Sequence, residues 1–135
     1  MKRFSWVFIL CALMVCIGMS QARAEEIKIG AILRLSLGAS DGLPAKRGIE
    51  IAVKEINAAG GINGKKLVVV YEDEKDSAQA AVAAYQKPVS MDKVSVIIGP
   101  MMSGNVLAVA PLAERDRITI ITPNGTSPKI SDAGQ

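Results

Sequence analysis

The sequence contains no histidine, and its two cysteines, Cys11 and Cys16, both lie near the amino terminus. Histidine is the commonest general base and the commonest metal ligand in proteins, so its absence removes the usual side chain for both tasks. The sequence also lacks a G-x-G-x-x-G turn after its first strand-like segment and a phosphate loop with Gly-Lys-Ser/Thr. These absences argue against an enzyme built on a nucleotide-binding sheet.

The first 24 residues have the pattern of a secretory signal peptide. Lys2 and Arg3 precede an apolar run over residues 6–19, and the small-x-small sequence ARA follows at residues 22–24. The run is shorter than the ~20 residues that span a bilayer, so the pattern favours cleavage over a membrane anchor. We expect cleavage before Glu25 and export to the periplasm.

Cleavage would change the composition of the chain. Lys+Arg falls from 16 to 13 while Asp+Glu stays at 13, so the net charge drops from +3 to about zero and gives no argument for nucleic-acid binding. Both cysteines leave as well, which excludes a disulfide, a thiol nucleophile and a cysteine metal site in the mature chain. Lipid attachment at Cys16 is the weaker alternative, because the bulky Val15 precedes it.

From residue 25 onward, segments that are typical of strands alternate with segments that are typical of helices. A strand pattern alternating with a helix pattern, with short joints, predicts an α/β fold with an open, mostly parallel sheet and helices on both faces. The predicted strands are residues 27–35, 66–73, 93–100 and 117–122, and the predicted helices are residues 44–61, a segment from about 76 to 87, and residues 103–115.

The helix ends carry specific signals. Gly60 or Gly61 can adopt the left-handed conformation that ends the first helix. Asp76 or Ser77 can cap the second helix, and Pro88 should end or kink it near residues 86–87. A proline at position 111 should bend the third helix. The expected buried faces are Ala45, Ile49, Ala52, Val53 and Ile56 in the first helix and Ala78, Ala81, Val82 and Tyr85 in the second.

In such sheets, ligands bind outside the carboxyl ends of the strands, where the loops over residues 36–43, 99–103 and 123–131 should meet. Ser103 stands where a helix begins, so its hydroxyl and the backbone N–H of Gly104 or Asn105 are suited to a carboxylate. The same position also suits a serine that merely caps its own helix, and composition alone favours that alternative.

The segment TPNGTSP, residues 122–128, also has two interpretations. Its composition is ordinary turn chemistry. Its carbonyl groups and the Thr126 hydroxyl could also receive an ammonium group opposite the Ser103 site. Nearby, the acidic residues Glu72, Asp73, Glu74 and Asp76 suggest a metal site, but a solvated turn that precedes a helix is the preferred interpretation.

Three segments carry a family resemblance: IKIGAIL at residues 27–33, RGIEIAVKEINAAGGINGKKLVVVYEDEKD at residues 47–76, and VSVIIGPMMSGNVLAVAPLAERDRITIITPNGTSP at residues 94–128. Together they closely resemble the N-terminal part of the branched-chain amino acid (leucine/isoleucine/valine) type of substrate-binding protein from bacterial ABC importers. The resemblance implies a type I periplasmic binding fold, in which two α/β lobes close on a ligand. It also implies transport of an amino acid with a membrane permease, without a cofactor, a metal or catalysis.

By position, the resemblance assigns Ser103 to the ligand carboxylate. It assigns Asn124 and Thr126 to the loop that contacts the amino and carboxylate ends of the ligand, and Gly104 completes the set through its backbone N–H. The first loop departs from the family pattern: Arg34 and SLGASDG replace the usual Thr-Gly-Pro and the aromatic residue that follows. This departure, with Asp41 and two serines in the loop, favours a more polar ligand such as an amide, urea or another amino acid.

The chain is also expected to be a fragment, with residues 25–135 forming a truncated N-terminal lobe, because the family continues for about 200 further residues. Half of a two-lobed site should bind weakly or not at all. Two other functions stay open. One is the extracellular ligand-sensing domain of a receptor, and the other, less favoured, is an enzyme on a doubly wound sheet.

Overall fold

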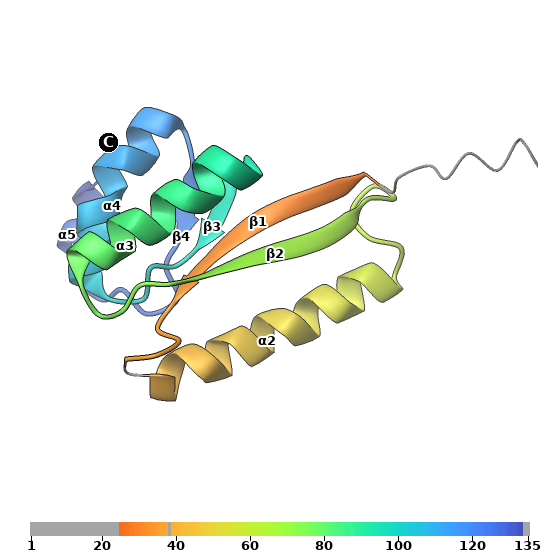
Figure 1. Ribbon diagram of the computed structural model, residues 1–135, viewed down its shortest axis with the longest axis horizontal. Coiled ribbons are helices and arrows are strands. Elements are labelled where there is room, and N and C mark those ends of the chain that lie inside the picture. Colours follow the sequence, from red (N-terminus) through yellow and green to blue (C-terminus); the bar gives the residue numbers. More distant parts are fainter. Residues whose placement is uncertain (1–24, 38, 134–135) are drawn as a thin grey trace, which may run out of the picture.

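The computed structural model describes residues 25–37 and 39–133, so the predicted signal peptide lies outside the described residues (Figure 1). Four strands form one parallel sheet in the order β2-β1-β3-β4, which confirms the predicted fold class. Within the described residues, no helix is long and apolar enough to cross a membrane. The elements are β1 (Glu26–Leu33), α2 (Ala39–Ala58), β2 (Lys66–Asp73), α3 (Ala78–Lys87), the π-helical turn η1 (Pro88–Asp92), β3 (Val96–Ile98), α4 (Ser103–Asp116), β4 (Thr119–Ile121) and α5 (Lys129–Asp132).

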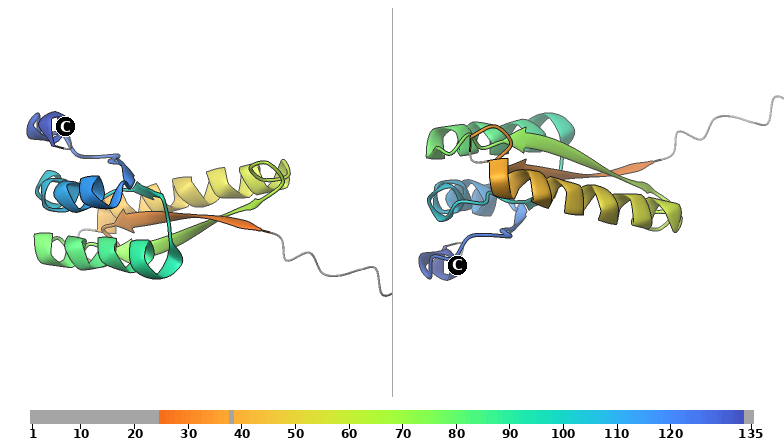
Figure 2. Two further views of the ribbon diagram at one scale, coloured as in Figure 1. Left: turned by 90° about the horizontal axis from the view of Figure 1, so that it is seen from above. Right: turned by 90° about the horizontal axis from the view of Figure 1, so that it is seen from below.

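Strand β1 lies inside the sheet, and its second half is covered on both faces. Its last residues, Ala31, Ile32 and Leu33, have no exposed surface, as expected for a strand buried on both sides. Side chains alternate between the faces of a strand, so Ile32 packs with α3 and α4, whereas Ala31 and Leu33 lie on the α2 side. Figure 1 shows the resulting three layers, with α2 on one face of the sheet and α3 and α4 on the other, and Figure 2 looks onto the two helical layers from above and from below.

Helix α2 begins earlier than the sequence predicts. The prediction placed a loop over residues 36–43 and a helix from Pro44, but the helix starts at Ala39 and contains Pro44. Gly42 explains the difference: it is buried, and a Cβ there would lie 1.8 Å from the carbonyl oxygen of Arg34. Packing of the first turn against the end of β1 therefore outweighs the hydrogen bond that Pro44 cannot donate. Ala52, expected on the buried face, is exposed.

The carboxyl end of α2 agrees with the prediction. Gly60 and Gly61 have φ values of 101° and 77°, and Gly61 donates its N–H to the carbonyl of Ile56 at 2.9 Å. The Asn57 side chain adds a link that the sequence did not predict. It donates to the Leu67 carbonyl at 2.9 Å and accepts from the Leu67 N–H at 2.8 Å, so it joins the helix end to the start of β2.

Helix α3 also begins and ends at predicted signals. The Ser77 hydroxyl accepts a hydrogen bond from the Ala80 N–H at 3.1 Å and caps the helix. The α-helix ends at Lys87, and the chain continues for one π-helical turn that begins at Pro88. Ala81, Ala84 and Tyr85 are buried as this helix packs on the sheet, whereas Ala78, expected to be buried, is exposed.

Candidate functional site

Hydrogen bonds join the loop after β3 to the loop after β4 at the carboxyl edge of the sheet. The Gly99 N–H donates to the carbonyl of Ile121 at 2.8 Å, and the Thr122 hydroxyl donates to the carbonyl of Pro100 at 2.8 Å. The Thr122 hydroxyl oxygen also accepts from the Gly125 N–H at 3.0 Å, which shapes the turn that follows. The structure therefore brings together two of the three loops predicted at this edge, whereas residues 39–43 of the third belong to α2.

Ser103 is the contact point between these loops. It is the first residue of α4, and Met102 stands at the N-cap position without a side-chain capping bond. The Ser103 hydroxyl oxygen accepts from the backbone N–H groups of Thr126 and Ser127, each at 3.2 Å. These bonds cross to the neighbouring loop, so the structure does not support the alternative in which Ser103 merely caps its own helix.

The surroundings of Ser103 can accommodate an anion. A hydroxyl oxygen that accepts two N–H groups keeps its own proton for donation to a third partner. Gly104 is exposed, and nothing lies within 4 Å of the place where its Cβ would stand. The first N–H groups of a helix have no partner within the helix and carry the positive end of its dipole. Chemically, this corner can bind a carboxylate.

A buried carboxylate, that of Glu74, holds the loop after β3 in place through hydrogen bonds. Glu74 has no exposed surface, and its two oxygens accept from the Met101 N–H at 3.1 Å and the Asn105 side-chain amide at 2.8 Å. Burial raises the pKa of Glu74, and the hydrogen bonds from Asn105, Met101 and Met102 only partly offset this. The interpretation of this residue as part of a solvated turn is therefore wrong. A glutamate within an acidic run carries no sequence signal that marks it as buried.

The neighbouring Asp73 has a structural role at the end of β2. Its carboxylate accepts from the Leu35 and Lys75 N–H groups at 3.0 and 3.1 Å and from the Ser36 hydroxyl. Burial acts to raise the pKa of Asp73, but the hydrogen bonds, led by that of Ser36, lower it below its usual value. In the described part of the chain, no three His, Cys, Asp or Glu residues are placed to hold a metal ion.

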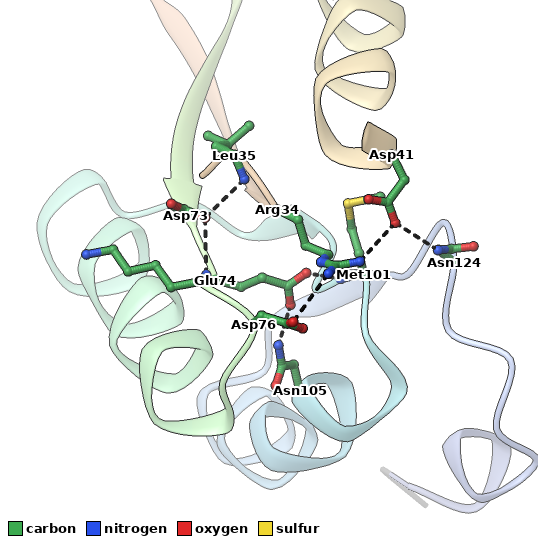
Figure 3. A network of polar contacts seen from close by, with 10 residues as sticks. Arg34, Leu35, Asp41, Asp73, Glu74, Asp76, Met101, Asn105 and Asn124 are labelled. Carbon is green, nitrogen blue, oxygen red and sulfur yellow. Dashed lines mark hydrogen bonds and ion pairs between the residues drawn. The ribbon is translucent and has the colours of Figure 1, made fainter. Parts of the chain in front are cut away.

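Arg34 forms a second, charged cluster at this edge, seen in Figure 3. Its guanidinium contacts the carboxylates of Asp41 at 3.4 Å and Asp76 at 3.3 Å, and its side chain is 17% exposed. Asn124, from the loop after β4, donates to the same Asp41 oxygen at 3.5 Å. Asn124 therefore faces the first turn of α2, whereas Thr126, two residues later, contacts Ser103 through its backbone. The sequence marks Arg34 and Asp41 as polar residues of the first loop, but no local pattern predicts their pairing.

Comparison with known proteins shows a family to which the chain is similar. The sequence pattern of the periplasmic binding protein family matches residues 26–134. The chain is 34% identical over 121 residues to the Leu/Ile/Val-binding protein of Escherichia coli K12, covering 85% of this chain and 31% of that protein. It is 32% identical over 114 residues to BasB of Halobacterium salinarum, a chemotactic signal transduction system substrate-binding protein, covering 82% of this chain and 28% of that protein.

A solved structure agrees with these relatives. LivJ of Streptococcus pneumoniae, a branched-chain amino acid transporter substrate binding protein in complex with isoleucine, superposes with a TM-score of 0.76 at 35% identity. The match covers 80% of this chain and 31% of LivJ. The chain thus spans about a third of the length of the proteins that it matches.

Proposed function

Because the chain belongs to the periplasmic binding protein family, we propose that it is the ligand-capturing part of an ABC importer, acting on an amino acid or a similar small polar ligand. The similarity to Leu/Ile/Val-binding and branched-chain amino acid binding proteins supports this function. In this proposal the chain binds and delivers its ligand to a membrane permease and carries out no catalysis. The cross-loop contact of Ser103 is the observation that carries the proposal.

The proposed site uses four residues at the carboxyl edge. The Ser103 hydroxyl and the Gly104 N–H would donate to the ligand carboxylate, because the Ser103 proton is available and the helix dipole favours an anion there. Thr126 would contribute its exposed hydroxyl, and Asn124 would contact the ligand from the same loop. Ser103 and Gly104 begin α4, and hydrogen bonds to Ser103 hold the loop that carries Asn124 and Thr126.

The proposed organisation has residues 1–24 as a cleaved signal peptide and residues 25–135 as the N-terminal lobe of a two-lobed domain in the periplasm. To test the first part, the 135-residue chain is expressed in a bacterium with a periplasm, and the intact mass of the product in the periplasmic fraction is measured. We expect the mass of a chain that begins at Glu25. A product that keeps residues 1–24, or that stays in the cytoplasm, would contradict export.

A ligand held by one lobe stays half exposed to water, so we predict weak binding by the 135-residue chain, with dissociation constants of about 1 mM or above. The recovered product, labelled with nitrogen-15, is titrated with leucine, glutamine and lysine while its amide resonances are followed. We expect the resonances of Thr126 and Ser127 to move, because both N–H groups bond to Ser103. Micromolar binding in a calorimeter would contradict the prediction that one lobe binds weakly. Resonances that do not move in a folded chain would contradict the proposed ligand site at Ser103.

Ligand sensing is the second candidate function, and the similarity to the chemotactic substrate-binding protein BasB favours it. An extracellular sensing domain of a receptor would use the same site but a different partner. Uptake of a labelled amino acid by cells with and without the gene separates the two functions. Loss of uptake in the deletion strain supports the importer, and unchanged uptake with lost chemotaxis supports the sensor.

A further inference from the structure

We propose that Asp41, held beside Arg34, receives a nitrogen-bearing polar group at the end of the ligand opposite its carboxylate. The proposal rests on the proposed function and deepens it, because it names the ligand class: an amino acid whose side chain carries N–H donors. It comes from the charged cluster that Arg34 forms with Asp41, Asp76 and Asn124 at the candidate site.

The position of Asp41 is set by backbone packing. Gly42 brings the first turn of α2 directly against the carbonyl of Arg34, and no larger residue fits between them. Asp41 therefore lies next to the guanidinium and within reach of Asn124 from the loop after β4. Since Thr126 of that loop contacts Ser103, one short loop connects Asp41 to the proposed carboxylate site.

The hydrogen-bonding capacity of the cluster is incomplete. One Asp41 oxygen, Oδ2, carries both contacts, to Arg34 at 3.4 Å and to Asn124 at 3.5 Å. The other oxygen, Oδ1, is shielded from solvent and has no hydrogen-bond partner within the described residues, and the same holds for the Nε–H of Arg34. A shielded carboxylate oxygen without a donor is unfavourable, so a ligand N–H that reaches it would gain a charge-assisted bond. The long contacts to Oδ2 can adjust as the carboxylate turns toward such a donor.

The charges at the cluster also favour a ligand group with N–H donors over a carboxylate. Arg34 carries one positive charge and contacts two carboxylates, those of Asp41 and Asp76. The cluster is thus short of positive charge and would repel a second carboxylate on the ligand. An aliphatic side chain would leave the shielded Asp41 Oδ1 without a donor. An amide or ammonium group supplies the N–H donor for Asp41, and the carbonyl oxygen of an amide can also accept from the Arg34 Nε–H.

The test compares leucine, glutamine and lysine, which share the same amino and carboxylate groups and differ in their side-chain ends. Using the amide titration described above, we expect glutamine or lysine to bind the recovered chain about tenfold more tightly than leucine, which is the lower end of the range for one hydrogen bond to a charged group. Asp41→Asn replaces the free acceptor by a donor and should abolish this preference. Asp76→Asn, which removes the same charge from the other partner of Arg34, is the matched control and should keep it.

The outcomes separate this inference from the proposed function. If leucine moves the Thr126 and Ser127 resonances and binds as tightly as glutamine and lysine, the ligand site stands and the role of Asp41 is overturned. An unchanged preference in Asp41→Asn overturns it too. If no amino acid moves these resonances in a chain that is folded by circular dichroism, the proposed function fails, and this inference fails with it.

Discussion

Two carboxylates at the same sheet edge, those of Glu74 and Asp41, are held in opposite ways. Glu74 is fully buried, and both of its oxygens accept hydrogen bonds, at 2.8 and 3.1 Å. The Asp41 side chain is 34% exposed, its two contacts are 3.4 and 3.5 Å long, and its second oxygen has no partner in the described part of the chain. Figure 3 shows the two groups on either side of Arg34.

The difference indicates which group at this edge holds the structure in place and which group can form new bonds to a ligand. The Glu74 carboxylate accepts hydrogen bonds from Met101 and Asn105, which lie on either side of Ser103 in the sequence. This carboxylate therefore fixes the start of α4. The contacts of Asp41, to the Arg34 guanidinium and to the exposed Asn124 amide, are longer, so Asp41 holds its surroundings less tightly. A binding site needs both properties: groups that hold the geometry and groups whose bonding capacity is still unused.

Removal of the Glu74 side chain should have the largest effect. Glu74→Ala leaves a buried N–H and a buried amide without an acceptor and opens a cavity, so we expect a loss of about 3–5 kcal/mol in the free energy of unfolding. Urea unfolding measures the loss. Glu50→Ala, the same substitution at a half-exposed carboxylate of α2 that pairs with Lys46 at 3.8 Å, should cost no more than ~0.5 kcal/mol. Equal losses would remove the distinction between the two kinds of carboxylate.

Two glycines of α2 should respond with opposite signs. Gly42→Ala places a Cβ 1.8 Å from the Arg34 carbonyl oxygen, which forces the first turn away from β1 and should destabilise the fold by about 1–3 kcal/mol. Gly48→Ala meets nothing within 4 Å and should stabilise the helix by about 0.5–1 kcal/mol. Thermal unfolding of both variants checks this. A neutral Gly42→Ala would show that the contact holding Asp41 beside Arg34 is not structural.

Ser103→Ala tests the hydrogen bonds between the Ser103 hydroxyl and the loop after β4. The substitution removes the acceptor of two backbone N–H groups, both partly open to water, so we expect a loss of about 1 kcal/mol. It should also abolish the ligand-induced shifts of the Thr126 and Ser127 resonances. Ser95→Ala, at an exposed position before β3, serves as the control for loss of a hydroxyl. Full ligand response in Ser103→Ala would exclude the hydroxyl from binding.

The pH dependence of stability gives the smallest expected effect. Burial raises the pKa of Glu74 above its usual 4.5, so the folded chain holds this proton more tightly than the unfolded chain does. Stability from this group is therefore fully present below pH 4.5 and is lost as the pH rises through the folded-state pKa. Glu74→Gln cannot lose a proton. The difference in free energy of unfolding, Glu74→Gln minus the unmodified chain, should therefore increase from pH 4.5 to pH 7.5, as measured by urea titrations. A difference that does not change with pH would contradict the raised pKa.

Much of the fold could be predicted because its signals are local. Strand β2, the start of α4 at Ser103, the cap at Ser77 and the left-handed glycines after α2 follow from patterns within a few residues of each element. The start of α2 could not be predicted in this way. Pro44 is a good helix-start signal, but Gly42 packs against Arg34, which lies outside the helix in sequence.

The sequence by itself determined the α/β alternation, the turns and the edge at which the polar loops collect, because periodicity and backbone preferences act over short stretches. Only the tertiary structure decided what each polar side chain does there. Ser103 bonds across to the loop after β4, Glu74 is buried, and Asp41 keeps a shielded oxygen without a partner in the described residues. Burial and pairing depend on which distant segments pack together, and no pattern within one segment records that.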